Sequence, residues 1–111
     1  MSPTERWEGN GPSYRDVSDY AADVRARDGV GVRWWITPPV YIKTTGRWTS
    51  WAVSIEVWTI GASKNRTWNA SAAYGQNGAW KTVPAAMLAT LRAYEQKRED
   101  ERVAAEAQAM F

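Results

Sequence analysis

The chain has 111 residues, of which 44% are hydrophobic and 23% are charged, and its formal net charge is +2. This length suits one globular domain with a modest core. The absence of cysteine and histidine excludes disulfides, thiol nucleophiles, imidazole bases and metal sites built on sulfur or nitrogen ligands. No segment has the roughly 20 apolar residues of a membrane span, and the N-terminus lacks a secretory pattern. We therefore expect a soluble cytoplasmic protein with no membrane contact, metal or cofactor.

The first elements are an N-terminal arm and a helix. Residues 1–12 contain prolines and glycines without periodicity, which predicts a flexible arm. Ser13 is a good N-cap, supported by Asp16 three residues later, and apolar residues then recur at helical spacing as far as Val24. Gly29 supplies the stop signal.

The hydrophobic period changes to two from Val30 onward, which predicts strands. The first covers residues 30–37 and is ended or kinked by Pro38-Pro39. An edge strand over residues 40–43, a turn over 44–46 and a strong strand over 48–58 follow. A third strand of small side chains covers residues 67–74, between turns at 61–65 and 75–78.

A long helix is predicted from Thr82, with Pro84 in its first turn and an apolar stripe formed by Met87, Leu88, Leu91 and Tyr94. Residues 95–102 are too polar to be buried, so the helix should project from the domain. Its end carries apolar residues that would form a dimerisation or partner contact, and the alternative is a frayed tail. These residues are Val103, Ala107, Met110 and Phe111.

The fold class that follows is α+β. We expect a small antiparallel sheet of three to four strands, flanked by the N-terminal helix and the long C-terminal helix. Residues 13–94 would form the single domain, residues 1–12 the arm, and residues 95–111 the projecting helix end with its apolar tip.

Tryptophan and positive charge are concentrated in the sheet. Seven of the eight tryptophans lie between residues 34 and 80, and residues 30–82 carry six Lys and Arg against a single carboxylate, Glu56. Aromatic rings stack on bases, and cations neutralise phosphates. The pattern favours a non-enzymatic protein that binds single-stranded nucleic acid or a nucleotide.

Strand alternation assigns the candidate site to one face. If the face with Val32, Trp34, Ile36, Trp51, Val53, Ile55 and Val57 meets the helices, the binding residues share the other face. Trp35 and Trp58 would stack bases, with Trp48 as a secondary ring. Glu56 would accept hydrogen bonds from a base edge or pair with Arg33. The predicted phosphate contacts are Arg33, Lys43, Arg47 and Arg66.

Other interpretations remain open at this point. The tryptophans could be core residues, with the helices covering both faces of the sheet. Trp and Arg also dominate protein interfaces, so the chain could be a small inhibitor or adaptor that docks on a larger acidic protein. A bacteriophage could encode such a protein against a host target. It would use the Trp/Arg surface or the C-terminal helix, and that helix could also form a homodimer. An enzyme, which would depend on Glu56, is the least favoured class.

Overall fold

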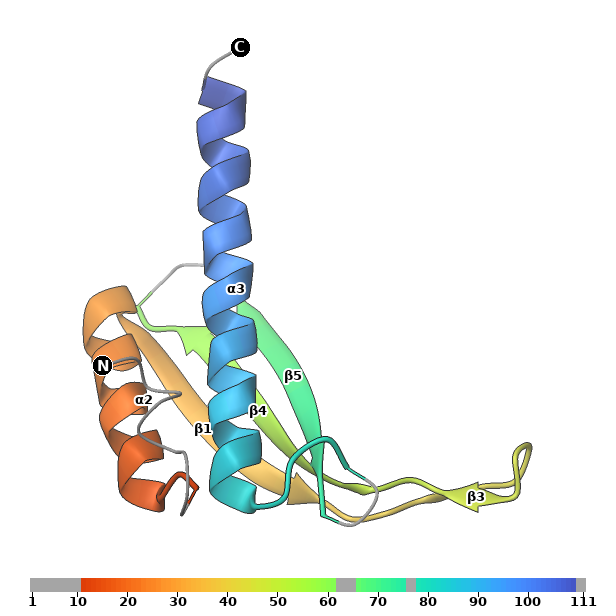
Figure 1. Cartoon of the computed structure of the whole chain (residues 1–111). Helices are drawn as coiled ribbons and strands as arrows, with labels where there is room; N and C mark the ends of the chain where they lie inside the picture. Colours follow the sequence, from red (N-terminus) through yellow and green to blue (C-terminus); the bar gives the residue numbers. More distant parts are fainter. Residues whose placement is uncertain (1–10, 62–65, 76–77, 110–111) are drawn as a thin grey trace.

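The computed structural model describes residues 11–61, 66–75 and 78–109. It has the predicted α+β architecture, with a three-stranded antiparallel sheet of order β1-β4-β5, a two-stranded sheet of β2 and β3, and a helix at each end (Figure 1). Most of the predicted arm and the centres of the predicted turns at 61–65 and 75–78 lie outside the described residues. The elements are α2 (Tyr14–Asp28), β1 (Val30–Thr37), β2 (Tyr41–Ile42), β3 (Arg47–Trp48), β4 (Trp51–Thr59), β5 (Thr67–Tyr74) and α3 (Val83–Ala109).

Local signals determine both ends of α2. The Ser13 side chain accepts a hydrogen bond from the Asp16 backbone N–H, and the Asp16 carboxylate accepts from the Ser13 N–H at 2.8 Å. This reciprocal arrangement satisfies N–H groups that a helix start leaves unpaired. Gly29 ends the helix in the left-handed conformation at φ 64°, where its N–H donates to the Arg25 carbonyl. Both predicted helix signals are confirmed.

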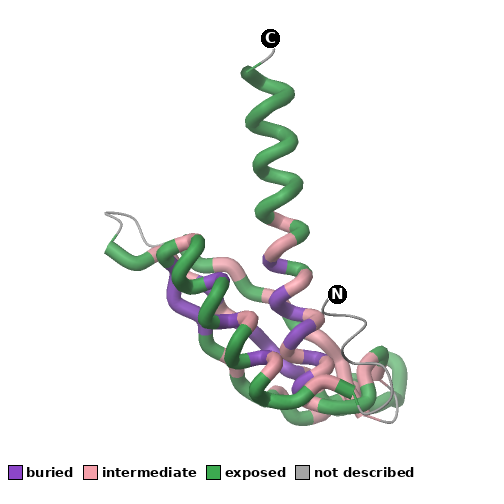
Figure 2. The backbone as a smooth tube through the Cα atoms, turned by 60° about the vertical axis from the view of Figure 1, so that its left-hand side comes forward, coloured by how far each residue is buried: buried purple, intermediate pink, exposed green. Residues whose placement is uncertain are grey.

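Both helices pack against the same face of the three-stranded sheet. One core cluster contains residues from α2, α3, β1 and β4, including Val24, Leu91, Val32 and Ile55. Figure 2 shows these buried segments gathered where the helices meet the sheet, with the distal half of α3 fully exposed. The interpretation that the helices close both faces is therefore wrong. The opposite face, which we call the open face, is covered by no described helix.

Strands β1 and β2, followed by β3 and β4, form one long hairpin with a single register. Val30 pairs with Thr59 at one end and Ile42 with Arg47 at the other, so no residue is gained or lost between them. The prolines at 38 and 39 cannot donate to the ladder, so they interrupt the strands without shifting the register. The predicted strand over 48–58 is consequently split into β3 and β4.

The far end of this hairpin, residues 38–51, projects from the body of the molecule (Figure 1). From here on we call this segment the arm. It is distinct from the N-terminal arm predicted for residues 1–12. Ile36 and Trp51 lie on the helix-side face by register, yet they are 43% and 47% exposed. Val53, the partner of Ile36, is fully buried, so the cover provided by the helices ends within this row of the sheet. Within the described residues, neither helix has the length and apolar character that crossing a bilayer would require.

Candidate functional site

The register assigns the side chains of the open face to rows across β1, β4 and β5. Trp58 pairs with Gly31 on one side and Thr67 on the other, and Glu56 lies between Arg33 and Asn69. The next row carries the following residues: Trp35, Ser54 and Ser71. The structure thus brings four predicted site residues onto the open face, and these are Arg33, Trp35, Glu56 and Trp58.

Arg33 connects the charged and aromatic parts of this face. Its Nη2 donates to Glu56 Oε2 at 3.0 Å, which is one of the two arrangements predicted for Glu56. Its guanidinium carbon also lies 5.7 Å from the centroid of the Trp35 ring, within cation–π range. Because the Arg33 side chain is largely exposed, this ion pair contributes little to stability. The pair instead orients the guanidinium beside an exposed ring.

Trp58 lies against the backbone of Gly31. A Cβ atom at residue 31 would lie 2.1 Å from Cε2 of the Trp58 ring, so only glycine leaves room for it. One side of the ring is therefore covered by β1, and the residue is half-buried. Arg33, Glu56, Trp58 and Thr67 line a hollow of about 290 Å³ beside it.

A row of hydroxyl groups crosses the sheet beside Trp35. The buried Ser54 Oγ lies 3.2 Å from Thr37 Oγ1 and 2.8 Å from Ser71 Oγ. These hydrogen bonds satisfy the hydroxyl of Ser54 on the floor of the open face. The small side chains leave a low floor beside the taller Trp35 ring. The strand alternation places Ser54 on this face, and only the register adds Thr37 and Ser71 to the row.

Three predicted site residues lie on the arm instead of the main sheet. Trp48 is 68% exposed and pairs with Tyr41, and their ring centroids are 5.5 Å apart. The continuous register assigns both rings to the same side of the hairpin as Trp35. Lys43 lies in the arm's terminal loop. Arg47 pairs with Ile42, which assigns its side chain to the helix-side face, and both cations are exposed.

Arg66, the remaining predicted phosphate contact, lies at the opposite end of the sheet. It precedes β5 and lines a cavity of about 600 Å³ together with Trp58, Trp68, Lys97 and Arg98. The predicted phosphate contacts therefore do not lie together. They are distributed along the length of the hairpin, and Arg66 is on the helix side of the sheet instead of the open face.

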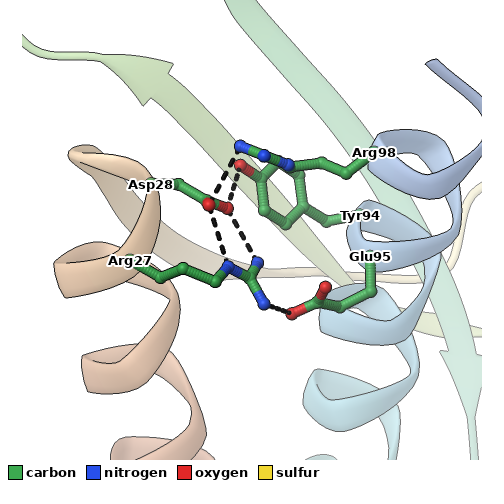
Figure 3. Close-up of polar contacts among 5 residues, drawn as sticks. All are labelled: Arg27, Asp28, Tyr94, Glu95 and Arg98. Carbon is green, nitrogen blue, oxygen red and sulfur yellow. Dashed lines mark hydrogen bonds and ion pairs between the residues drawn. The ribbon is translucent and has the colours of Figure 1, made fainter. Parts of the chain in front are cut away.

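Asp28 is a buried carboxylate that sequence reasoning missed. Its side chain is only 1% exposed, and Arg27 binds it through two nitrogens, each at 2.8 Å. From α3, Arg98 Nη1 lies 2.9 Å from Oδ1 and the Tyr94 hydroxyl donates to Oδ2 at 2.8 Å (Figure 3). Arg27 also reaches Glu95 at 2.9 Å. This network joins the end of α2 to the middle of α3.

The charges of this network shift the pKa values of its members. The hydrogen bonds from Arg27, together with that from Tyr94 and the charge of Arg98, lower the pKa of Asp28 although burial opposes them. Burial raises the pKa of Tyr94, and its hydrogen bond to the Asp28 carboxylate raises it further. Asp28 is thus held ionised and in place between two cations. These contacts join α2 to α3, which is a structural role.

The predicted partner contact at the C-terminus is only partly described. Val103 and Ala107 are exposed on the projecting part of α3, whereas Met110 and Phe111 lie outside the described residues. Dimerisation or partner binding through this tip stays a prediction.

Within residues 11–61, 66–75 and 78–109, no cluster of three or more acidic groups could hold a metal ion. Comparison with protein-family models, with curated proteins and with solved structures finds no match for this chain. The interpretation of the open face therefore depends on its own geometry and chemistry.

Proposed function

We propose that the chain binds single-stranded nucleic acid along the open face of the long hairpin. The observation that supports this proposal is that both helices pack on one face of the sheet, while Trp35 and Trp58 share the other face with Arg33. Exposed aromatic rings on a sheet stack unpaired bases, and adjacent cations neutralise the backbone.

The ring spacing favours a strand of nucleotides over a mononucleotide. Trp58 pairs with Gly31, and Trp35 lies four residues further along β1, which corresponds to about 13 Å. Stacked aromatic rings have centroids about 4.5–7 Å apart, so this backbone separation leaves room for a separate base on each tryptophan. Successive bases of one strand would occupy both rings, whereas one mononucleotide would use only part of this surface. The low hydroxyl floor beside Trp35 gives room for one of these bases.

The arm extends this row of aromatic side chains on the open face, and we call the whole row the track. Trp48 and Tyr41 lie on the same side of the hairpin by register, and Lys43 and Arg47 lie near the arm's end. No carboxylate of the described residues forms an ion pair with Lys43, Arg47 or Arg66. Lys43 is therefore available to a phosphate near the end of the arm. Arg47 and Arg66 lie on the helix side by register, so they would contact phosphates only where the strand passes around the ends of the sheet.

A matched pair of tryptophans tests the proposal. Trp35 and Trp51 are similarly exposed, at 43% and 47%, but lie on opposite faces of the same hairpin. We expect Trp35→Ala to weaken binding of labelled single-stranded DNA or RNA by roughly 5- to 150-fold, the equivalent of about 1–3 kcal/mol per stacked base. Trp51→Ala should leave the affinity unchanged. Fluorescence anisotropy would measure both, with circular dichroism confirming the fold.

Equal losses in the two variants would show that the face does not matter, and absence of binding by the wild-type chain would reject the proposal. Mononucleotides should compete poorly against oligonucleotides. Trp58→Ala is a weaker test, because this ring also covers Gly31 and its loss would alter stability.

A second candidate function is a protein-binding adaptor. The helix-side face of the arm exposes Val40, Ile42 and Trp51 with nothing described packed against them. Such residues would suit an apolar protein surface. Under this function, Trp51→Ala would abolish capture of the partner while oligonucleotide binding would be absent in every variant.

A further inference from the structure

The second edge of the three-stranded sheet is an unprotected strand. β5 has only β4 as its neighbour in the sheet, and Thr67–Tyr74 contains no charged residue and no proline. Natural proteins protect exposed edges with charges, prolines, bulges or a covering segment. β5 lacks the first two over its whole length. Of the described segments, residues 78–80 cover the end of this edge, where Trp80 bridges to Tyr74 and Gly78 lies against the backbone of Ala73 and Tyr74.

Two hydrogen bonds identify which backbone groups of β5 face outward. The Thr59 N–H donates to the Arg66 carbonyl at 3.1 Å, so the backbone N–H and C=O groups of the even-numbered residues in this segment point towards β4. The backbone groups of the odd-numbered residues must then point away from β4. Trp80 confirms this, because its N–H donates to the carbonyl of Ala73 at 3.2 Å on the outer side. Thr67, Asn69 and Ser71 therefore present their N–H and C=O groups to the free edge.

The opposite edge of the sheet is not equivalent. The outward carbonyl of Val32 on β1 accepts a hydrogen bond from Arg25 Nη2 at 2.8 Å, and α2 lies alongside that strand (Figure 1). A strand that approached β1 would have to displace this side chain. Edge pairing is consequently favoured at β5.

We propose that a second copy of this chain pairs antiparallel with β5 and forms a dimer with one continuous sheet. With the two-fold axis at Asn69, Thr67 of each copy pairs with Ser71 of the other, and Asn69 pairs with its own counterpart. This register uses the outward groups of Thr67, Asn69 and Ser71, while the carbonyl of Ala73 is already bonded to Trp80. On the open face only Thr67, Asn69 and Ser71 meet across the interface. On the helix side Trp68 lies opposite Ala70 and Arg66 opposite Ala72, so no two like charges face each other.

The proposal does not depend on nucleic-acid binding, and it uses a different surface from the tip of α3. Both open faces of the dimer would lie on the same side of the joined sheet. Asn69 is exposed on the open face, so changes there need not disturb the core.

Sedimentation equilibrium over a concentration series, without nucleic acid, tests the dimer. We expect the wild-type chain to associate and Asn69→Lys to shift it to monomer, because the substitution opposes two like charges at the axis. Ala22→Lys adds the same charge on the exposed side of α2 and should leave the dimer intact. Asn69→Pro should also give a monomer, since it removes only an outward N–H on an edge strand.

A cross-linking experiment gives the positive counterpart, because the chain contains no cysteine. The paired Cα atoms at the axis would lie about 5.5 Å apart, a distance that a disulfide can span. Oxidised Asn69→Cys should therefore yield a covalent dimer, whereas the control Ala22→Cys should not.

A wild-type chain that is monomeric at every concentration would overturn the proposal. So would a dimer that survives Asn69→Lys, or one that disappears only when the chain is truncated after Arg102. The last result would assign the association to the tip of α3.

Discussion

Asp28 shows how one residue can join elements that are far apart in the sequence. Its carboxylate is fully buried at the end of α2, yet it contacts side chains of α3 about 70 positions later. A buried carboxylate is costly unless it is paired and hydrogen-bonded. Here Arg27, Tyr94 and Arg98 supply these interactions, so the residue fixes the position of α2 against α3.

Replacing Asp28 should destabilise the fold in a pH-dependent way. We expect Asp28→Asn to lower the free energy of unfolding by about 1–3 kcal/mol near neutral pH. The folded-state pKa of Asp28 lies below its unfolded value of about 3.9, so this contribution is present above that value and is lost as the pH falls through the folded pKa. Urea denaturation over an acidic pH series should therefore show the difference between wild type and variant shrinking.

Asp23→Asn provides the control, because Asp23 is exposed on the same helix. Its unfolding free energy should stay close to that of the wild type. A constant difference for Asp28→Asn across the acidic range would contradict the assigned role of the carboxylate.

At the scale of elements, the arm is separable from the core. The core cluster contains no residue between 38 and 51, and the arm's side chains are mostly exposed. Two-stranded hairpins gain little stability in isolation, so the arm depends on the sheet from which it extends. Apart from Trp51, which pairs with Tyr74 of β5, no residue of the arm belongs to the three-stranded sheet.

Removing the arm should therefore preserve the fold. Thr37 pairs with Ala52, and an Asn-Gly turn placed between them would close a hairpin of two-residue loop length. We expect the free energy of unfolding of this variant to lie within about 1 kcal/mol of that of the full chain. Its affinity for oligonucleotides should fall. Thermal unfolding and anisotropy measure the two effects. Loss of the folded state would show that the arm contributes to the core.

Several elements were predictable because their signals are local. The capping pair Ser13 and Asp16, the stop at Gly29 and the alternation over residues 30–37 and 67–74 depend only on neighbouring residues. Each fixes a hydrogen-bonding pattern or a backbone angle within a few positions. The structure has these elements at the predicted places.

Other features depend on contacts that the sequence order does not reveal. That α2 and α3 share one face is decided by packing over the whole sheet. The burial of Asp28 requires Tyr94 and Arg98, and the half-buried position of Trp34 involves a hydrogen bond from its Nε1 to Thr90 at 3.0 Å. The prolines at 38 and 39 indicated an interruption, but only the partner strand shows that the register continues across it.

At the scale of the whole molecule, the cations lie along the hairpin and not around one point. Arg66 is near one end, Arg33 near the middle, and Lys43 and Arg47 near the other end. Arg33 lies on the open face of the main sheet and is paired with Glu56, so contacts with the other three cations require a strand that extends past both ends of the three-stranded sheet.

This distribution predicts the salt dependence of binding. Each phosphate neutralised on a single strand contributes about −0.7 to the slope of log K against log salt, so contacts by Arg33, Lys43, Arg47 and Arg66 give a slope of roughly −3. The double variant Lys43→Gln and Arg47→Gln should flatten the slope by about 1.4. Arg15→Gln, on the exposed side of α2, should not change it. An unchanged slope in the double variant would exclude the arm from the track.

The hydrogen bond from Arg25 to Val32 also limits how far edge pairing can proceed. A sheet with two open edges could add copies indefinitely and grow into a fibre. Here one edge is obstructed by a cationic side chain from α2, so pairing through the other edge uses the available strand in both copies at once. Addition of further chains to the sheet then stops at two. The chain therefore avoids polymerisation although β5 itself carries no charge.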